Sequence, residues 1–259
     1  MIDFELIKKK LKTLKQQNNR FNTTWKAKEG SYIVRLIPTE KELFREVYVY
    51  YFLGNEIAPG GIIAPGQSFG KPDPIQDFQR QLFEDGTDES KQLAKTMNPK
   101  LRAYVPIIVR GEEDQGVRWW SFSKSVYERL MELCFHPEIE DITDVKKGHD
   151  LAVEVKPQPN GYAKTTIDPK FSPSVLSASA SKVEEWLKNS PKFEDIIEIK
   201  THDEIESLLT RWLNSQTSSS NENSDDDDSN GDRTSNKSNK SVKDLDEMFE
   251  NLYDKADDK

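Results

Sequence analysis

Apolar residues almost disappear from the sequence after Leu213, and this limits how much of the chain can fold. Residues 214–241 are mainly Ser, Asn and Asp, and they include the run Asp225 to Asp228. Such a segment cannot bury enough apolar surface to offset the entropy of ordering its backbone. We therefore expect one folded core over residues 21–213 and an acidic, largely disordered tail over residues 214–259.

Charge divides the chain into three parts. Residues 1–28 carry eight basic and two acidic residues, a net charge of +6, whereas residues 214–259 carry six basic and thirteen acidic residues, a net charge of -7. The total of -9 leaves -8 for the middle. A basic start and an acidic end favour competition for one cationic surface. The negative middle fits a polyanion partner only if its acidic residues lie away from a local basic groove.

The cysteine count and the hydropathy exclude several classes of protein. Cys134 is the only cysteine, so the chain cannot form an internal disulfide or a cysteine-based zinc site. No apolar run approaches the roughly 20 residues that a membrane span needs. We expect a soluble intracellular protein that does not contact a membrane.

The middle of the sequence is mainly β with inserted helices, an α+β class. Alternating β-branched and aromatic residues predict strands at 31–38, 46–53, 101–110, 117–123, 151–156 and 162–167. Helical spacing of apolar residues predicts helices at 74–83, 89–97, 125–135, 181–188 and 201–213. The last of these begins with Thr201 and Glu204 at the spacing of a capping box. Glycines and prolines at short intervals predict a long loop over residues 59–74.

The basic arm, residues 1–20, places apolar residues at helical spacing between its lysines. These apolar residues are Phe4, Ile7, Leu11 and Leu14. So short a helix is marginal on its own in water. We expect it to form when the arm meets a partner.

The tip of the tail, residues 242–253, has a similar pattern with acidic residues between the apolar ones. Leu245, Phe249 and Leu252 fall at three- and four-residue steps. This spacing is typical of a helix that forms in the groove of a partner protein. The alternative is a tail that only solvates the chain.

Aromatic and basic residues alternate on several of the expected strands. Aromatic rings exposed beside cations stack on the bases of single strands with little sequence preference. The candidate single-strand-binding residues are Arg35, Tyr48, Tyr50, Lys100, Arg102, Tyr104, Arg118, Trp119, Trp120, Lys124, Tyr162 and Lys164. Adjacent Trp119 and Trp120 must point to opposite faces of their strand. The alternative is that these rings fill the core of a β-rich fold.

Three stretches occur in a recognisable order, namely Val34-Arg-Leu-Ile-Pro38, Tyr104-Val-Pro-Ile-Ile-Val109 and Val117-Arg-Trp-Trp-Ser-Phe-Ser-Lys124. With both charged ends, this order resembles the single-stranded DNA-binding (helix-destabilising) proteins of T-even-type phages over residues 32–171. The resemblance implies a β-barrel of the oligonucleotide-binding type with a basic, aromatic cleft. It also implies a basic arm that drives cooperative binding and an acidic tail that recruits replication proteins.

The resemblance assigns roles to particular residues. Arg35 corresponds to a cleft arginine, Trp120 to a stacking tyrosine, and Tyr104 to one member of a Tyr-Trp pair. The residues that match the cooperativity motif of the arm are Lys8, Lys9, Lys10, Lys12 and Thr13.

The sequence departs from the family at its structural zinc. T-even members have a Cys-Pro-x-Cys turn among the zinc ligands, and here the corresponding stretch is Asp73-Pro74-Ile75-Gln76. Without thiolates, this stretch cannot build a thiolate-rich tetrahedral site. We expect no zinc and no other cofactor, and we expect Ile62, Ile63, Ile75 and Phe78 to hold the loop by packing.

The function that these patterns favour is cooperative, sequence-nonspecific coating of single-stranded DNA in phage DNA replication, recombination and repair, without enzymatic activity. The expected partners are single-stranded DNA, further copies of this chain and, through the tail, the phage DNA polymerase, helicase loader and recombination mediator proteins. The expected location is the cytoplasm of the infected host cell. RNA remains a possible ligand, because base stacking does not read the 2'-hydroxyl.

Two other classes of function stay open. An acidic protein-interaction scaffold that binds no nucleic acid would fit the negative middle. A metal-dependent nuclease would use Asp144 or Asp150 with Glu154 to hold magnesium, and Lys156 to assist the attacking water.

Overall fold

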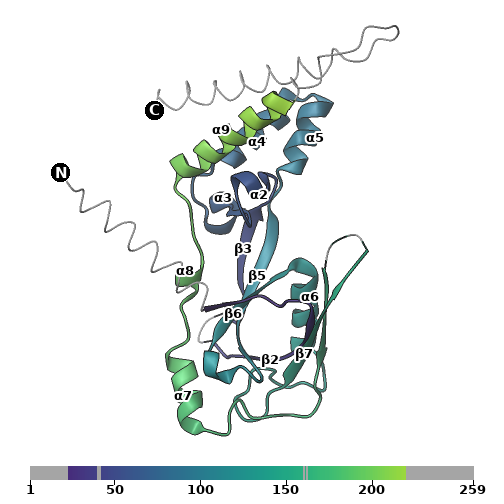
Figure 1. The fold of residues 1–259 in the computed structure, drawn as a ribbon, viewed down its shortest axis with the longest axis vertical. Helices are drawn as coiled ribbons and strands as arrows, with labels where there is room; N and C mark the ends of the chain where they lie inside the picture. Colours follow the sequence, from purple (N-terminus) through teal and green to yellow (C-terminus); the bar gives the residue numbers. More distant parts are fainter. Residues whose placement is uncertain (1–22, 40–41, 160, 162, 220–259) are drawn as a thin grey trace, which may run out of the picture. The chain divides into compact units, whose positions relative to one another are not determined.

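The computed structural model describes residues 23–39, 42–159, 161 and 163–219 (Figure 1). The basic arm, Tyr162 and the tail from residue 220 onward lie outside the described residues. The chain divides into two compact units: unit 1 comprises residues up to Glu46 and Leu101–Glu198, and unit 2 comprises Val47–Lys100 and the residues from Ile199 onward.

The fold is mixed α+β, with an open, mostly antiparallel sheet of eight strands, which confirms the predicted class. The strands are β1 (Thr24–Trp25), β2 (Gly30–Leu36), β3 (Arg45–Tyr50), β4 (Ile62–Ile63), β5 (Lys100–Val109), β6 (Arg118–Ser123), β7 (Asp150–Pro157) and β8 (Ala163–Pro169). The main path runs β1-β6-β5-β2-β7-β8, while β3 and β4 lie off it and pair with each other. Among the described strands, the pairing does not close into a barrel.

Unit 1 has a core between its strands and helix α6 (Lys124–Cys134). Alternate residues of each strand point to the same face, so β7 contributes Leu151, Val153 and Val155 to the core. One face of α6 adds the buried residues Val126, Tyr127, Leu130 and Leu133. The remaining helices of unit 1 are the 3-10 turn η1 (Glu113–Gln115), α7 (Ala180–Lys188) and α8 (Phe193–Ile196).

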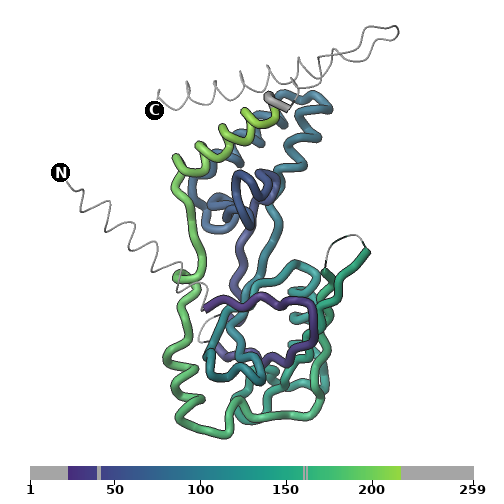
Figure 2. Tube along the Cα trace, viewed as in Figure 1, coloured from purple at the N-terminus to yellow at the C-terminus, as the bar shows by residue number. Residues whose placement is uncertain are grey.

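Unit 2 brings together two segments that are far apart in the sequence, as the trace in Figure 2 shows. Its helices are α2 (Gly54–Ile57), α3 (Pro65–Phe69), α4 (Pro74–Asp85), α5 (Asp88–Thr96) and α9 (His202–Ser219). The predicted capping box begins α9: the Thr201 amide donates to the Glu204 carboxylate at 2.9 Å, and the Glu204 amide donates to the Thr201 hydroxyl at 3.3 Å.

The stretch predicted as a long loop, residues 59–74, contains β4 and the short helix α3. Pro65 occupies the first turn of α3, where its missing amide costs nothing, and Gly70 ends the helix in the left-handed conformation. Glycine and proline therefore act here as helix boundary residues rather than as signs of irregular chain. The predicted packing of Ile62, Ile63, Ile75 and Phe78 is confirmed, because all four side chains are buried.

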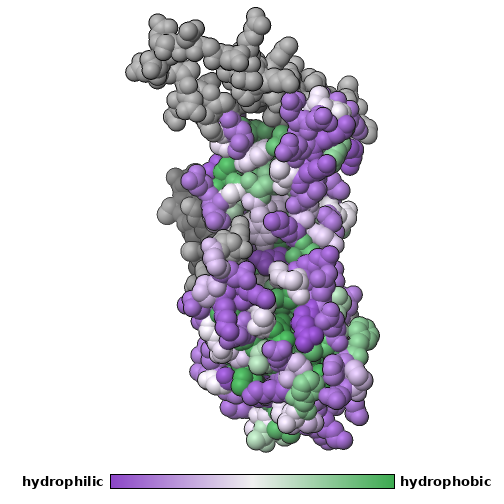
Figure 3. Space-filling model, turned by 90° about the vertical axis from the view of Figure 1, so that its right-hand side faces the viewer, coloured by the Kyte–Doolittle hydropathy of each residue, from purple (hydrophilic) through white to green (hydrophobic). Residues whose placement is uncertain are grey.

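Polar side chains predominate on the face drawn in Figure 3, with apolar residues scattered between them. The large apolar side chains that are well exposed include Phe135 and Phe171. Within the described residues, no helix is both long enough and apolar enough to span a bilayer.

Candidate functional site

Strands β5 and β6 form an antiparallel hairpin whose two faces have different characters. Arg102 pairs with Ser123, Tyr104 with Ser121, and Pro106 with Trp119. Side chains of directly opposed residues lie on the same face. One face, which we call the hairpin face, therefore carries Arg102, Tyr104, Trp119, Ser121 and Ser123.

The opposite face of the hairpin points into the core of unit 1, where Ala103, Val105, Trp120 and Phe122 are buried. The two adjacent tryptophans thus point in opposite directions, as predicted. Trp120 packs edge-on against Trp25 and Phe122, at ring-centroid distances of 5.6 and 4.9 Å. With 2% of its surface exposed, Trp120 is a core residue in this structure and not a ring available for stacking.

The aromatic end of the hairpin face consists of Tyr104 and Trp119. Both rings contact Phe193 of α8, each at a centroid distance of 5.2 Å, and Trp119 is 5% exposed. The Trp119 indole nitrogen donates a hydrogen bond to the carbonyl oxygen of Pro191 at 2.8 Å. A cavity of about 680 Å³ lies beside Trp119 and Phe193, and its charged lining consists of Arg45, Lys192, Glu42 and Glu194.

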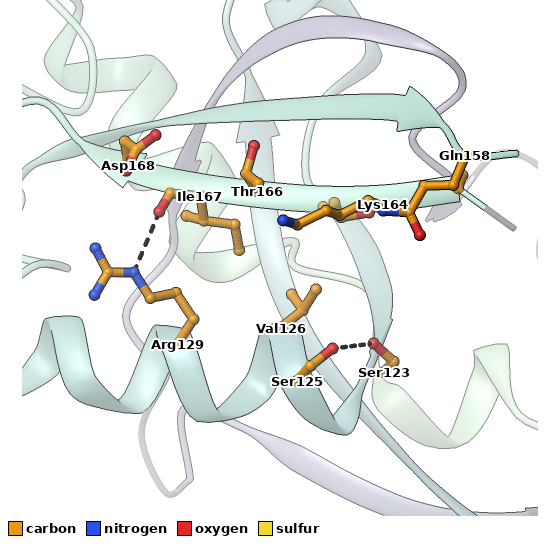
Figure 4. A pocket seen from close by; sticks show the side chains of 11 residues that line it. Ser123, Ser125, Val126, Arg129, Gln158, Lys164, Thr166, Ile167 and Asp168 are labelled. Atoms are coloured by element: carbon orange, nitrogen blue, oxygen red, sulfur yellow. Dashed lines mark hydrogen bonds between the residues drawn. The ribbon is translucent and has the colours of Figure 1, made fainter.

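A second cavity, of about 710 Å³, lies between α6 and β8 at the end of β6, and we call it the groove. Ser123 of the hairpin face, Arg129 of α6 and Lys164 of β8 are among the residues that line it. Figure 4 shows Arg129 extending from the helix toward the strand, while Lys164 extends along the strand. The Arg129 Nε donates to the Ile167 carbonyl oxygen at 3.4 Å.

The chemistry of the groove suits an extended anionic chain. Its lining includes two cations, Arg129 and Lys164, one carboxylate, Asp168, and the hydroxyl-bearing residues Ser123, Ser125, Thr165 and Thr166. Arg129 also pairs with Glu132 at 3.2 Å across a well-exposed contact, which a phosphate could replace at little cost. Lysine, arginine and hydroxyl side chains are the usual donors to phosphate oxygens.

The structure brings together only some of the predicted site residues. Arg102, Tyr104 and Trp119 share the hairpin face, whereas Lys164 lines the groove, to which the hairpin face contributes only Ser123. Lys124 is an exposed residue at the start of α6 and pairs with Glu128 at 3.5 Å. Arg118 is tied to Glu112 at 2.6 Å.

The predicted residues Tyr48, Tyr50 and Lys100 belong to unit 2. Tyr50 is 2% exposed, and its hydroxyl donates to the Asp73 carboxylate at 3.0 Å, so its ring is not available to a base in this structure. Tyr48 is half-buried and Lys100 is exposed. Tyr162, the arm residues and the tail residues lie outside the described part of the chain.

Arg35, predicted to line a cleft, is 0% exposed. Its guanidinium pairs with Asp150 at 3.4 Å and donates to the carbonyl oxygens of Asp144 at 2.6 Å and Ser174 at 3.0 Å. Burial lowers the pKa of Arg35, although Asp150 opposes this shift. Arg35 cannot contact a single-stranded nucleic acid from this position. It acts instead as a buried cross-link within unit 1.

The carboxylates predicted for the nuclease alternative form hydrogen bonds or ion pairs with other groups of the protein. Asp150 accepts hydrogen bonds from Arg110 as well as Arg35, while Asp144 accepts from the amides of Lys146 and Lys147, which hold the pKa of its carboxyl below the usual range. Glu154 pairs with Lys156 at 2.8 Å. One group that could hold a metal ion does occur in the described residues, but it consists of His202, Asp203 and Glu206 at the start of α9 and includes none of these carboxylates.

Sequence reasoning missed Arg45, Arg129 and Phe193. Arg129 stands near Glu128 and Glu132 on an amphipathic helix, and charged residues in such a group usually lie on the solvated face. Phe193 lies in a four-residue helix too short for periodicity to be detected. Its only signal was an apolar residue shortly after Pro191.

The fold and the hairpin face together define a two-unit α+β protein with a partly basic groove in unit 1. No protein-family profile matches the sequence, and no curated protein is significantly similar to it. The resemblance to phage single-stranded DNA-binding proteins therefore rests on the residues quoted above.

Proposed function

We propose that this protein binds single-stranded DNA through unit 1, without sequence preference and without catalysis. The observation that carries the proposal is the shared face of β5 and β6, on which Arg102, Tyr104 and Trp119 lie in register and whose residue Ser123 also lines the groove. Rings at one end and cations at the other match the two needs of a single strand, base stacking and phosphate neutralisation.

The finer fold that we propose for unit 1 is of the oligonucleotide-binding type. It is supported by the run of short, mostly antiparallel strands around one apolar cluster, with α6 packed against that cluster. A protein that binds single-stranded DNA more tightly than duplex DNA shifts the melting equilibrium toward the single strand by mass action. Binding along the hairpin face would therefore favour unpaired DNA without catalysis.

The two charged ends complete the proposal. The basic arm contacts the neighbouring copy along the strand and makes binding cooperative, and the acidic tail recruits replication and recombination proteins. Both roles come from the resemblance and from the charge pattern of the sequence. The phage and host setting has the same basis.

A protein-interaction scaffold is the second candidate. It is favoured by the negative middle of the chain and by the burial of Trp119 and Trp120. Titration of a labelled oligo(dT) separates the two, since a scaffold leaves the fluorescence anisotropy of the oligonucleotide unchanged.

Lys164→Ala and Arg129→Ala test the groove directly. Each lost phosphate contact on a single strand is expected to reduce the slope of log K against log salt by about 0.7. The measurement is oligo(dT) anisotropy over a series of salt concentrations. The matched control is Lys188→Ala, which removes an exposed lysine of unit 1 that pairs with Glu184 at 2.6 Å. Equal slopes of log K against log salt in all variants would mean that single-stranded DNA binds outside the groove.

Deletion of residues 220–259 tests the tail while keeping α9, which ends at Ser219, intact. The acidic tail competes with phosphates for cations, so its loss is expected to tighten oligo(dT) binding about tenfold at low salt and much less at high salt. The measurement is the same titration at two salt concentrations. Unchanged or weaker binding at low salt would contradict the competition.

A further inference from the structure

The aromatic end of the hairpin face is covered by a short segment that follows α7. This segment, residues 190–196, contains the four-residue helix α8, and we call it the strap. Phe193 lies on Tyr104 and Trp119, each at a ring-centroid distance of 5.2 Å. The rings that a base would stack on are thus already occupied by an aromatic ring of the same chain.

We infer that Tyr104 and Trp119 form a base-stacking site that Phe193 fills in the free protein, and that an unpaired nucleotide replaces Phe193 there. This inference rests on the proposed function and adds to it a concealed site and the step that opens it. A nucleobase, like the Phe193 ring, is flat and aromatic, and Phe193 now packs edge-on against Tyr104 and tilted against Trp119, at interplanar angles of 71° and 59°. With Trp119 only 5% exposed, stacking requires the strap to move.

The strap is held by the buried side chains of Phe193 and Ile196, which are 4% and 8% exposed, and by polar contacts to Trp119 and Arg45. The Trp119 indole donates to the Pro191 carbonyl at 2.8 Å, and the Arg45 guanidinium lies 4.9 Å from the centre of the Phe193 ring. Arg45 also pairs with Glu194 at 3.3 Å, and because both side chains are partly exposed, this pair is screened by water and salt. Bound single-stranded DNA can therefore replace these polar contacts with contacts of its own.

A cavity lies beside the strap, where the sugar and phosphate of a stacked nucleotide would have to fit. The cavity of about 680 Å³ next to Trp119 and Phe193 gives the displaced ring or the incoming base space without repacking the core. Two cations, Arg45 and Lys192, and two carboxylates, Glu42 and Glu194, line the same cavity, and the cations are the groups that a phosphate attached to the stacked base would contact.

A closed strap lowers the apparent affinity of the site by the fraction of molecules in which the site is open. If the strap is closed in about nine of ten free molecules, removing its ring raises the affinity for a single strand about tenfold. Phe193→Ala in the full-length chain is therefore expected to bind oligo(dT) about tenfold more tightly. Phe171→Ala is the matched control, because it removes a half-exposed phenylalanine of unit 1. Unchanged or weaker binding by Phe193→Ala, with the fold intact, would overturn the inference.

A second pair of variants keeps the inference testable if Phe193→Ala does not fold. Glu194→Ala breaks the pair with Arg45, whereas Asp195→Ala removes the same charge from the next residue and leaves that pair in place. Both changes are on exposed side chains. Glu194→Ala is expected to tighten oligo(dT) binding several-fold more than Asp195→Ala does. Equal effects would mean that only net charge matters and that the strap does not open.

Hydrogen–deuterium exchange of the wild-type protein separates failure of this inference from failure of the proposed function. Saturating oligo(dT) is expected to speed exchange at residues 192–197 while β5 stays protected. No binding of oligo(dT) by any variant would refute the proposed function itself. Binding with slower or unchanged exchange in the strap would leave the proposed function standing and refute only the displacement of Phe193.

Discussion

Replacing Arg35 with alanine is expected to destabilise unit 1 by about 3–5 kcal/mol, the usual cost of removing one partner from a buried ionic network. The guanidinium is 0% exposed and donates to the carbonyl oxygens of Asp144 and Ser174. Without it, the Ser174 carbonyl oxygen would lose this donor, the Asp144 carbonyl oxygen would keep only the Gly148 amide at 2.9 Å, and a cavity would remain beside them. Asp150 would keep Arg110, which donates to it at 2.9 Å, so the carboxylate itself would stay neutralised.

The measurement is urea unfolding of wild type and Arg35→Ala, followed by the near-ultraviolet signal of the tryptophans in unit 1. Arg129→Ala is the control, because this arginine is exposed and its loss is expected to cost less than about 1 kcal/mol. Arg35→Lys should give an intermediate loss, since one ammonium group cannot reproduce the forked geometry of the guanidinium. A loss below about 1 kcal/mol for Arg35→Ala would show that water or neighbouring donors satisfy the freed oxygens.

The role of Arg35 could not be predicted from the alternation of its strand. Val34, Leu36 and Ile37 around it are all buried, so β2 is covered on both faces and period two carries no information about exposure. The sequence signal was a single arginine within an apolar run. Its partners Asp144, Asp150 and Ser174 are more than a hundred residues away, at separations that no local pattern reveals.

The hairpin, by contrast, was predictable because its information is local. Two alternating runs around an acidic turn fixed β5 and β6, and the adjacent tryptophans had to point in opposite directions. The sequence could not show that both indoles would be buried. Trp120 faces the core, whereas Trp119 is covered by Phe193, which is distant in sequence. The strands and the opposite orientation of the two tryptophans were therefore predicted correctly, whereas the burial of Trp119 was not predicted.

Replacing Asp73 with alanine is expected to destabilise unit 2 by about 2–4 kcal/mol. Asp73 is the N-cap of α4, where its Oδ1 accepts from the amides of Ile75 and Gln76. Its other oxygen accepts from the Gly66 amide at 3.2 Å and from the Tyr50 hydroxyl at 3.0 Å. Loss of a cap costs about 1 kcal/mol, and a buried hydroxyl left unpaired costs about 1–3 kcal/mol more.

Thr87→Ala is the matched control for Asp73→Ala. Thr87 caps α5 by accepting from the Ser90 amide at 3.1 Å, but its side chain is exposed. Its loss is expected to cost about 1 kcal/mol in urea unfolding of the same unit. Equal losses for the two variants would mean that Asp73 acts only as a cap and that the Tyr50 hydroxyl finds another partner.

The pH dependence of unit 2 gives an independent test of the same residue. Burial raises the pKa of the Asp73 carboxyl above its ordinary value, while the Gly66, Gln76 and Ile75 amides and the Tyr50 hydroxyl oppose this shift. Because the folded state then holds the proton more tightly than the unfolded chain does, the free energy of unfolding falls as pH rises from about 4 through the folded pKa. Asp73→Asn does not titrate, so the stability advantage of Asp73 over Asn is expected to shrink between pH 4 and pH 7. An advantage that grows over this range would mean that the four hydrogen-bond donors outweigh burial, and that the carboxylate is the preferred form in the folded protein.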